Sequence, residues 1–140
     1  MASYNKFNQF TQDLVNGVYD FGNHSFKVML TNSAPVSTNT VKANLTEISA
    51  GNGYTAGGSS TTMTTSTSAG TAKVTASDVV FTASGGSIGP FRYAVLYDDT
   101  PTSPAKPLIA WWDYGSSITL NDTETLTVDF DNTNGIFTIA

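Results

Sequence analysis

Cysteine is absent from this chain, and charged residues are scarce. The 140 residues include no Cys, so disulfides and thiolate metal sites are excluded and stability is independent of the redox compartment. Charged residues make up 12% of the chain, about half of the share found in an ordinary soluble domain. Something other than charge therefore keeps the protein soluble, or much of its surface is covered.

Basic residues and long apolar runs are also lacking. Six Lys and Arg stand against eleven Asp and Glu, which gives a formal net charge of −5. Nucleic-acid binding needs clustered basic side chains that displace counterions, so nucleic acid is not expected as a partner. No segment approaches the roughly 20 apolar residues of a membrane span, and the start of the chain lacks the pattern of a secretory signal. We expect no membrane association and synthesis in the cytoplasm of a host cell.

What the sequence does contain favours β-structure. Thr, Ser, Gly, Asn and aromatic residues dominate, a composition typical of pleated strands joined by tight turns. A chain of this length fits one domain with one sizeable core. We therefore predict a mainly β fold in which residues 1–140 form a single antiparallel β-sandwich, jelly-roll-like or related, with one N-terminal amphipathic helix.

The helix is predicted over residues 4–19. Apolar side chains recur there every three or four residues and so share one face, with Ser3 as the N-cap: Phe7, Phe10, Leu14 and Val18. Immediately afterwards, Phe26–Thr31 alternates with the period of two that marks a strand. Residues 59–70 are almost entirely Ser and Thr, which predicts either an exposed edge strand or a flexible arm.

Short strands are expected throughout the second half of the chain. The predicted ranges are 72–76, 79–83, 91–97, 107–114, 118–120, 124–130 and 136–140. In one of them Leu126, Val128 and Phe130 should face the core. Asn134-Gly135 between two apolar runs indicates a hairpin turn.

The segment from Leu108 to Tyr114 places large side chains on both of its faces. Either both faces are covered within the fold, or one of them meets a neighbouring molecule, because permanent interfaces are enriched in Trp, Tyr and Phe. The candidate interface residues are Trp111, Trp112 and Tyr114, together with Tyr54, Phe7 and Phe10. Sparse charge and abundant aromatics also predict a homo-oligomer, such as a trimer or another lattice-matched assembly.

Motifs for chemistry are weak throughout. Carboxylates such as Asp98 and Asp113 could in principle act as the acid and base of a glycosidase. Their spacing in the sequence gives little support for such an active site. Asp129 and Asp131 resemble the start of a calcium loop, yet no later Glu follows. The single histidine, His24, is expected to be a helix-end residue. We predict no catalytic residues, no metal and no cofactor.

Several longer stretches carry a family resemblance. They are residues 4–7, 26–35, 45–48 leading to 51–58, 85–97 and 111–115. Together they resemble a widespread family of small tailed-bacteriophage virion proteins, and they span nearly the whole chain apart from the Ser/Thr tract.

The resemblance implies a structural component of the virion without catalytic residues. It points most directly to a capsid decoration or cement protein that lies on the capsid surface and binds and stabilises the lattice of the major capsid protein. The alternative is a tail or fibre component in which Tyr54, Trp111 and Tyr114 stack on host glycans.

Overall fold

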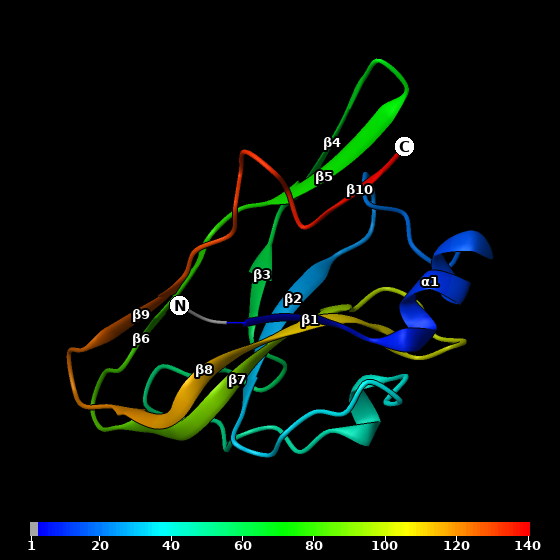
Figure 1. The fold of residues 1–140 in the computed structure, drawn as a ribbon. Coiled ribbons are helices and arrows are strands. Elements are labelled where there is room, and N and C mark those ends of the chain that lie inside the picture. Colours follow the sequence, from blue (N-terminus) through cyan, green and yellow to red (C-terminus); the bar gives the residue numbers. More distant parts are fainter. Residues whose placement is uncertain (1–2) are drawn as a thin grey trace.

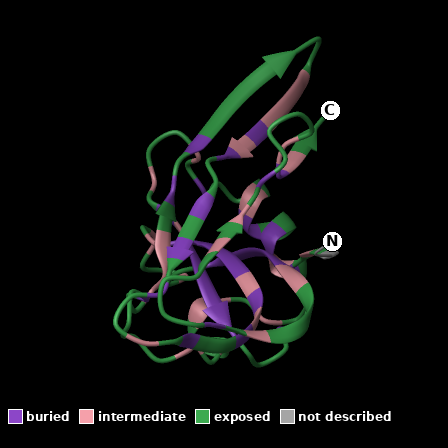
Figure 2. Ribbon diagram, turned by 90° about the vertical axis from the view of Figure 1, so that its left-hand side faces the viewer, coloured by how far each residue is buried: buried purple, intermediate pink, exposed green. Residues whose placement is uncertain are grey.

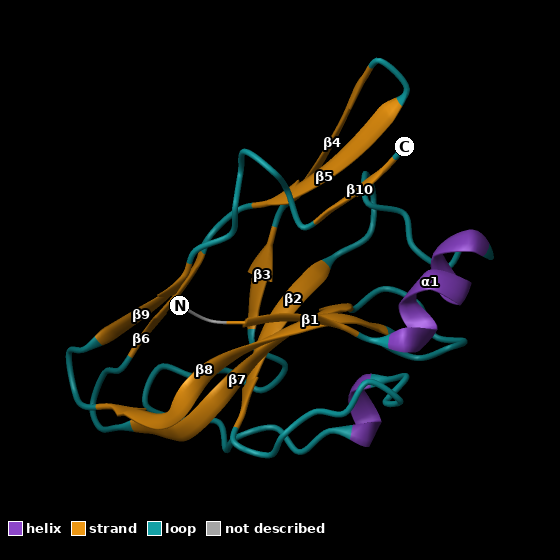
Figure 3. Ribbon diagram, in the orientation of Figure 1, coloured by secondary structure: helices purple, strands orange, loops and turns teal. Residues whose placement is uncertain are grey.

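The computed structural model describes residues 3–140 and confirms the predicted class. Three antiparallel sheets and one α-helix near the N-terminus make up the fold, in an arrangement consistent with a β-sandwich. Strands dominate the view in Figure 3, and the helix lies beside one end of the largest sheet.

The largest sheet has five strands in the order β1-β8-β7-β2-β3. Their bounds are Ser3–Lys6, Leu108–Leu120, Ile88–Asp98, Phe26–Thr31 and Ser59–Thr61. The long strands β7 and β8 form its centre (Figure 1). The two predicted strands at 107–114 and 118–120 are thus one continuous strand, β8.

Two smaller sheets complete the fold. One has the order β10-β5-β4, and the other pairs β6 with β9. The bounds are Met63–Ser68 for β4, Thr71–Ala76 for β5, Val79–Thr82 for β6, Thr125–Val128 for β9 and Phe137–Ile139 for β10. Residues 59–70 therefore form two edge strands, β3 in the large sheet and β4 in the three-stranded sheet. A turn joins β4 to β5.

The N-terminal helix is shorter than predicted. The α-helix α1 covers only Asn8–Val15, and a 3-10 helix, η1, follows at Lys42–Asn44. Residues 3–6 form β1 instead, because their backbone pairs with β8 in the register Tyr4↔Trp112 and Lys6↔Ala110. Phe7, not Ser3, occupies the N-cap position of α1. Pairing with a neighbouring strand has overridden the local helical pattern.

The hairpin predicted at Asn134-Gly135 is also wrong. The strands on either side of it, β9 and β10, belong to different sheets and do not pair. The turn is held locally, because the Asp131 carboxylate accepts hydrogen bonds from the backbone N–H groups of Thr133 and Asn134 at 2.8 and 2.9 Å. An Asx-type turn of this kind needs no strand partner.

Both faces of the five-stranded sheet are covered by apolar clusters. The larger cluster lies between this sheet and the two smaller ones, and Phe10 of α1 packs into it. The smaller cluster lies on the opposite face and contains Phe7, Tyr97 and Trp111, with Leu45 packed against it. Phe7 and Phe10, predicted to share a face, therefore enter different clusters. Figure 2 shows the buried residues concentrated in the body of the molecule and a projecting hairpin in which β4 is exposed and β5 is partly buried.

Candidate functional site

Only two of the six predicted interface residues reach the surface. Tyr114 is 52% exposed, and Trp112 is partly buried. The other four are at most 9% exposed within the chain, and they are Phe7, Phe10, Tyr54 and Trp111. These four side chains build the core, so a partner has no access to them.

Strand alternation separates the two neighbouring tryptophans. Trp111 points to the face that carries Phe7, and the two ring centroids lie 4.5 Å apart. Trp112 points to the other face, where its partner across the sheet on β7 is Ala94. The short alanine side chain leaves space beside the indole ring.

That space is a surface depression that we call the Trp112 groove. It has a volume of about 250 Å³, and its walls include Phe91, Ala94, Trp112, Tyr114, Val128 and Phe130. Strands β7 and β8 form one wall, and residues 126–130 form the other. The groove lies on the side of the large sheet that faces β9.

Packed aromatic rings form a ridge beside the groove. The rings of Trp112 and Phe130 meet edge to face at 5.2 Å, and Tyr4 packs edge to face against Trp112 at 5.6 Å. Beyond this ridge lies a second depression of about 630 Å³, lined among others by Tyr4, Asp131 and Ile136. The two depressions share Trp112, Asp129 and Phe130, so Trp112 contributes to both.

The charged groups around the groove differ in whether they are paired. Arg92 donates two hydrogen bonds to the Asp113 carboxylate, at 2.8 and 3.1 Å. The guanidinium and the Gly115 N–H hold the pKa of Asp113 below its usual range. Within residues 3–140, the Asp129 carboxylate has no hydrogen-bond or ion-pair partner. The groove is therefore an apolar depression whose charged lining residues are Asp129, which has no partner among residues 3–140, and Arg92, which is bonded to Asp113.

The carboxylates weighed for catalysis are engaged elsewhere. Asp98 is fully buried, and its Oδ2 lies 2.6 Å from Nδ1 of His24. Burial raises the pKa of Asp98 despite this contact. Asp99 forms ion pairs with Lys27 and Lys106. Asp113 lies on β8 and forms an ion pair with Arg92. Among residues 3–140, no group of three or more His, Cys, Asp or Glu side chains is arranged to hold a metal ion.

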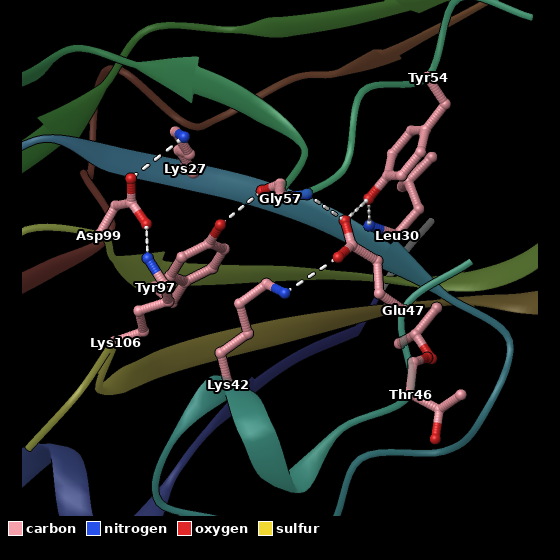
Figure 4. Close-up of polar contacts among 11 residues, drawn as sticks. Lys27, Leu30, Lys42, Thr46, Glu47, Tyr54, Gly57, Tyr97, Asp99 and Lys106 are labelled. Carbon is pink, nitrogen blue, oxygen red and sulfur yellow. Dashed lines mark hydrogen bonds and ion pairs between the residues drawn. The ribbon is translucent and has the colours of Figure 1, made fainter. Parts of the chain in front are cut away.

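Glu47, which sequence reasoning passed over, is the centre of a polar cluster beneath the sheet. Its carboxylate accepts hydrogen bonds from Tyr54 Oη at 2.7 Å, from the Gly57 N–H at 2.6 Å and from Lys42 Nζ at 2.9 Å (Figure 4). The Tyr54 hydroxyl in turn accepts the Leu30 N–H of β2. The cluster connects the irregular segment 41–58 to the large sheet. Glu47, which belongs to the stretch 45–48 that carries the family resemblance, therefore has a structural role.

Glu47 makes folding stability dependent on pH. Burial opposes its charge, but hydrogen bonds from Tyr54, Lys42 and Gly57 hold its pKa below the usual value. A lowered folded-state pKa contributes stability that is present above the unfolded pKa, about 4.5, and is lost as pH falls through the folded value. We expect Glu47→Gln to lose about 1–3 kcal/mol at neutral pH and to flatten the acid limb of the stability curve.

Chemical denaturation at a series of pH values measures this. Asp129→Asn, which changes an exposed carboxylate without a partner among residues 3–140, is the control and should be as stable as the wild type at each pH. If the stability of Glu47→Gln falls as steeply at acid pH as that of the wild type, the Glu47 cluster is not the source of the pH-dependent stability.

Comparisons with known proteins add no family to this geometry. No protein-family model, curated protein or solved structure matches the chain significantly. No helix within residues 3–140 is long and apolar enough to cross a membrane.

Proposed function

We propose that this chain is a structural protein of a tailed-bacteriophage virion, where it decorates the capsid surface and stabilises the lattice of the major capsid protein. The resemblance of its sequence stretches to small phage virion proteins supports this role. The observation that carries the proposal is the Trp112 groove, because it presents the aromatic side chains of Trp112 and Tyr114 in a concave, mainly apolar site.

The groove suits an apolar side chain of the capsid protein. Fully burying a Leu, Ile, Phe or Met side chain contributes about 1.5–3 kcal/mol, and aromatic anchors in concave sites dominate the energetics of interfaces. The Arg92–Asp113 pair at the rim is already satisfied within the chain. Binding through the groove should therefore depend mainly on buried apolar area, and any salt dependence should come from the Asp129 carboxylate.

The location of the chain in the particle tests this proposal. We expect mass spectrometry of separated heads and tails to find the chain in the head fraction, in a fixed ratio to the major capsid protein. The known tail proteins of the same preparation are the control for clean separation. Recovery of the chain with the tails alone would contradict the proposal.

One feature favours a second candidate, a tail or fibre protein that contacts host glycans. Tyr114 is exposed beside Trp112, and the unpaired Asp129 carboxylate lines the same depression. Flat aromatic rings suit the apolar faces of sugars, and a carboxylate accepts hydrogen bonds from their hydroxyl groups. Tail location combined with glycan binding that Tyr114→Ala abolishes would support this candidate over capsid decoration.

A further inference from the structure

The hairpin of β4 and β5 leaves the body of the molecule. Figures 1 and 2 show it as an arm that extends away from the large sheet, with the tip at the turn between the two strands. Met63 at its base is buried, but every residue of β4 from Thr64 to Ser68 is exposed. Strand β10 covers the other side of β5, so the exposed strand β4 is the side of this three-stranded sheet on which a further strand can be added.

Among the strands that lie at the ends of the sheets, β4 is the longest. Strand β4 lies at the end of the order β10-β5-β4, so within residues 3–140 its outer side pairs with no strand. It has six residues, whereas the other strands at sheet ends, β1, β3, β6, β9 and β10, have only three or four. Short edges are one way in which proteins prevent unwanted pairing, and among the strands at sheet ends in residues 3–140 only β4 departs from it.

Nothing else on β4 blocks strand addition. Its sequence from Thr64 to Ser68 contains only Thr and Ser, with no Pro, no charge and no glycine. Its pairing with β5 runs without a bulge from Met63↔Ala76 to Ser68↔Thr71. The charged side chain of the hairpin, Lys73, lies on β5 and donates to the Thr133 carbonyl.

The turn geometry shows which backbone groups of β4 face outward. Ala69 and Gly70 have φ values of 50° and 81°, as in a two-residue type I′ turn. In such a hairpin the residues flanking the turn exchange hydrogen bonds, and bonded and non-bonded pairs then alternate. Ser68, Ser66 and Thr64 therefore bond to β5. The N–H and C=O groups of Thr65 and Thr67 point to the open side.

We propose that β4 pairs with β4 of a second copy of this chain. The two strands run antiparallel about a two-fold axis at Ser66, so that Thr65 of each copy faces Thr67 of the other. The product is a continuous six-stranded sheet in the order β10-β5-β4-β4-β5-β10. This pairing closes at two copies, in place of the trimer expected from composition.

The edge itself argues for a second copy over a different protein. Strand addition takes its affinity from main-chain hydrogen bonds and its specificity from pockets for side chains. The uniform Thr/Ser edge offers no such pockets, but it is complementary to itself. Opposed Thr and Ser side chains form favourable cross-strand pairs. Two copies, each with a net charge of −5, meet here without placing like charges opposite each other.

Because the arm projects, the bodies of two copies need not collide when their β4 strands pair. Because the hairpin extends from the body in both views, two arms can meet while the bodies stay apart. The pairing therefore uses a different surface from the Trp112 groove. It does not depend on the proposed location in the phage head.

A charge-swap experiment on the full chain tests the pairing. We expect the wild type to sediment as a dimer at micromolar concentration. Thr65→Lys/Thr67→Lys and Thr65→Asp/Thr67→Asp should each be monomeric, because each places like charges opposite one another in both facing pairs. An equimolar mixture of these two variants should form a dimer again.

The matched control is Thr38→Lys/Thr102→Lys, which adds the same charge at two exposed loop threonines and should remain dimeric. A monomeric or trimeric wild type overturns the proposal. So does a Thr65→Lys/Thr67→Lys variant that still dimerises, or a mixture of the two charged variants that stays monomeric. Circular dichroism of each variant confirms that the fold is intact before the masses are compared.

Discussion

Replacing Gly58 with alanine is expected to leave the chain largely unfolded. Gly58 has a φ of +86°, and a Cβ atom added there would lie 1.9 Å from the Val28 carbonyl oxygen and 2.8 Å from the Met29 Cα. These are backbone atoms of the interior strand β2, so no side-chain rotation relieves the clash. We expect a loss of more than about 4 kcal/mol, a large part of the stability of a domain of this size.

Gly17→Ala is the matched control for this substitution. Gly17 also has a positive φ, +75°, but nothing lies within 4 Å of the position that a Cβ would take. It should lose only the roughly 1 kcal/mol that a left-handed conformation costs a non-glycine residue. Urea denaturation compares the two variants, and equal losses would show that the close approach of residue 58 to β2 is not tight.

Trp112→Ala is expected to reduce the affinity of the chain for capsids by about 30-fold to 1,000-fold. The indole forms part of both surface depressions, and truncating a central aromatic anchor typically costs about 2–4 kcal/mol of binding energy. Binding of the labelled variant to heads that have been stripped of the wild-type chain measures the effect.

Two further variants separate binding from folding. Tyr114→Ala removes a 52% exposed side chain from the groove and should weaken binding with little effect on stability. Val15→Ala removes an exposed apolar side chain from α1, outside the groove, and should bind as the wild type does. Undiminished binding by both groove variants would exclude the groove as the capsid contact.

The strand pattern of the sequence predicted much of the fold. The period-two alternation in residues 124–130 placed Leu126, Val128 and Phe130 inward, and these three side chains belong to or pack against the larger cluster. Phe26–Thr31 was predicted as a strand with the bounds that the structure shows for β2. For residues 124–130 alternation succeeds because one buried face fixes the register of a strand, whereas β2 proves to be buried on both faces.

The N-terminus shows where local pattern fails. The spacing of Phe7, Phe10 and Leu14 fits a helix, but Phe7 sits at its cap and turns to the opposite face of the sheet. The residues before it pair with β8, a contact more than 100 positions away in the chain. No local window contains that information, and tertiary pairing decides the outcome.

For a similar reason, the sequence predicts which residues could form the candidate site but not which of them are exposed. Alternation shows that Trp111 and Trp112 face opposite sides of their strand, but not which side is closed. The closure of the Trp111 side depends on Phe7 and Leu45, which arrive from distant segments. The width of the groove depends on Ala94 beside Trp112, a pairing that the sequence does not specify.

Adding the chain back to stripped heads is the experiment that bears on the proposed stabilisation of a phage head. Heads depleted of the chain should rupture at milder osmotic or thermal stress than intact heads. Adding the purified wild-type chain should restore resistance, and adding Trp112→Ala at the same concentration should not. Equal rupture of intact, depleted and restored heads would contradict the account.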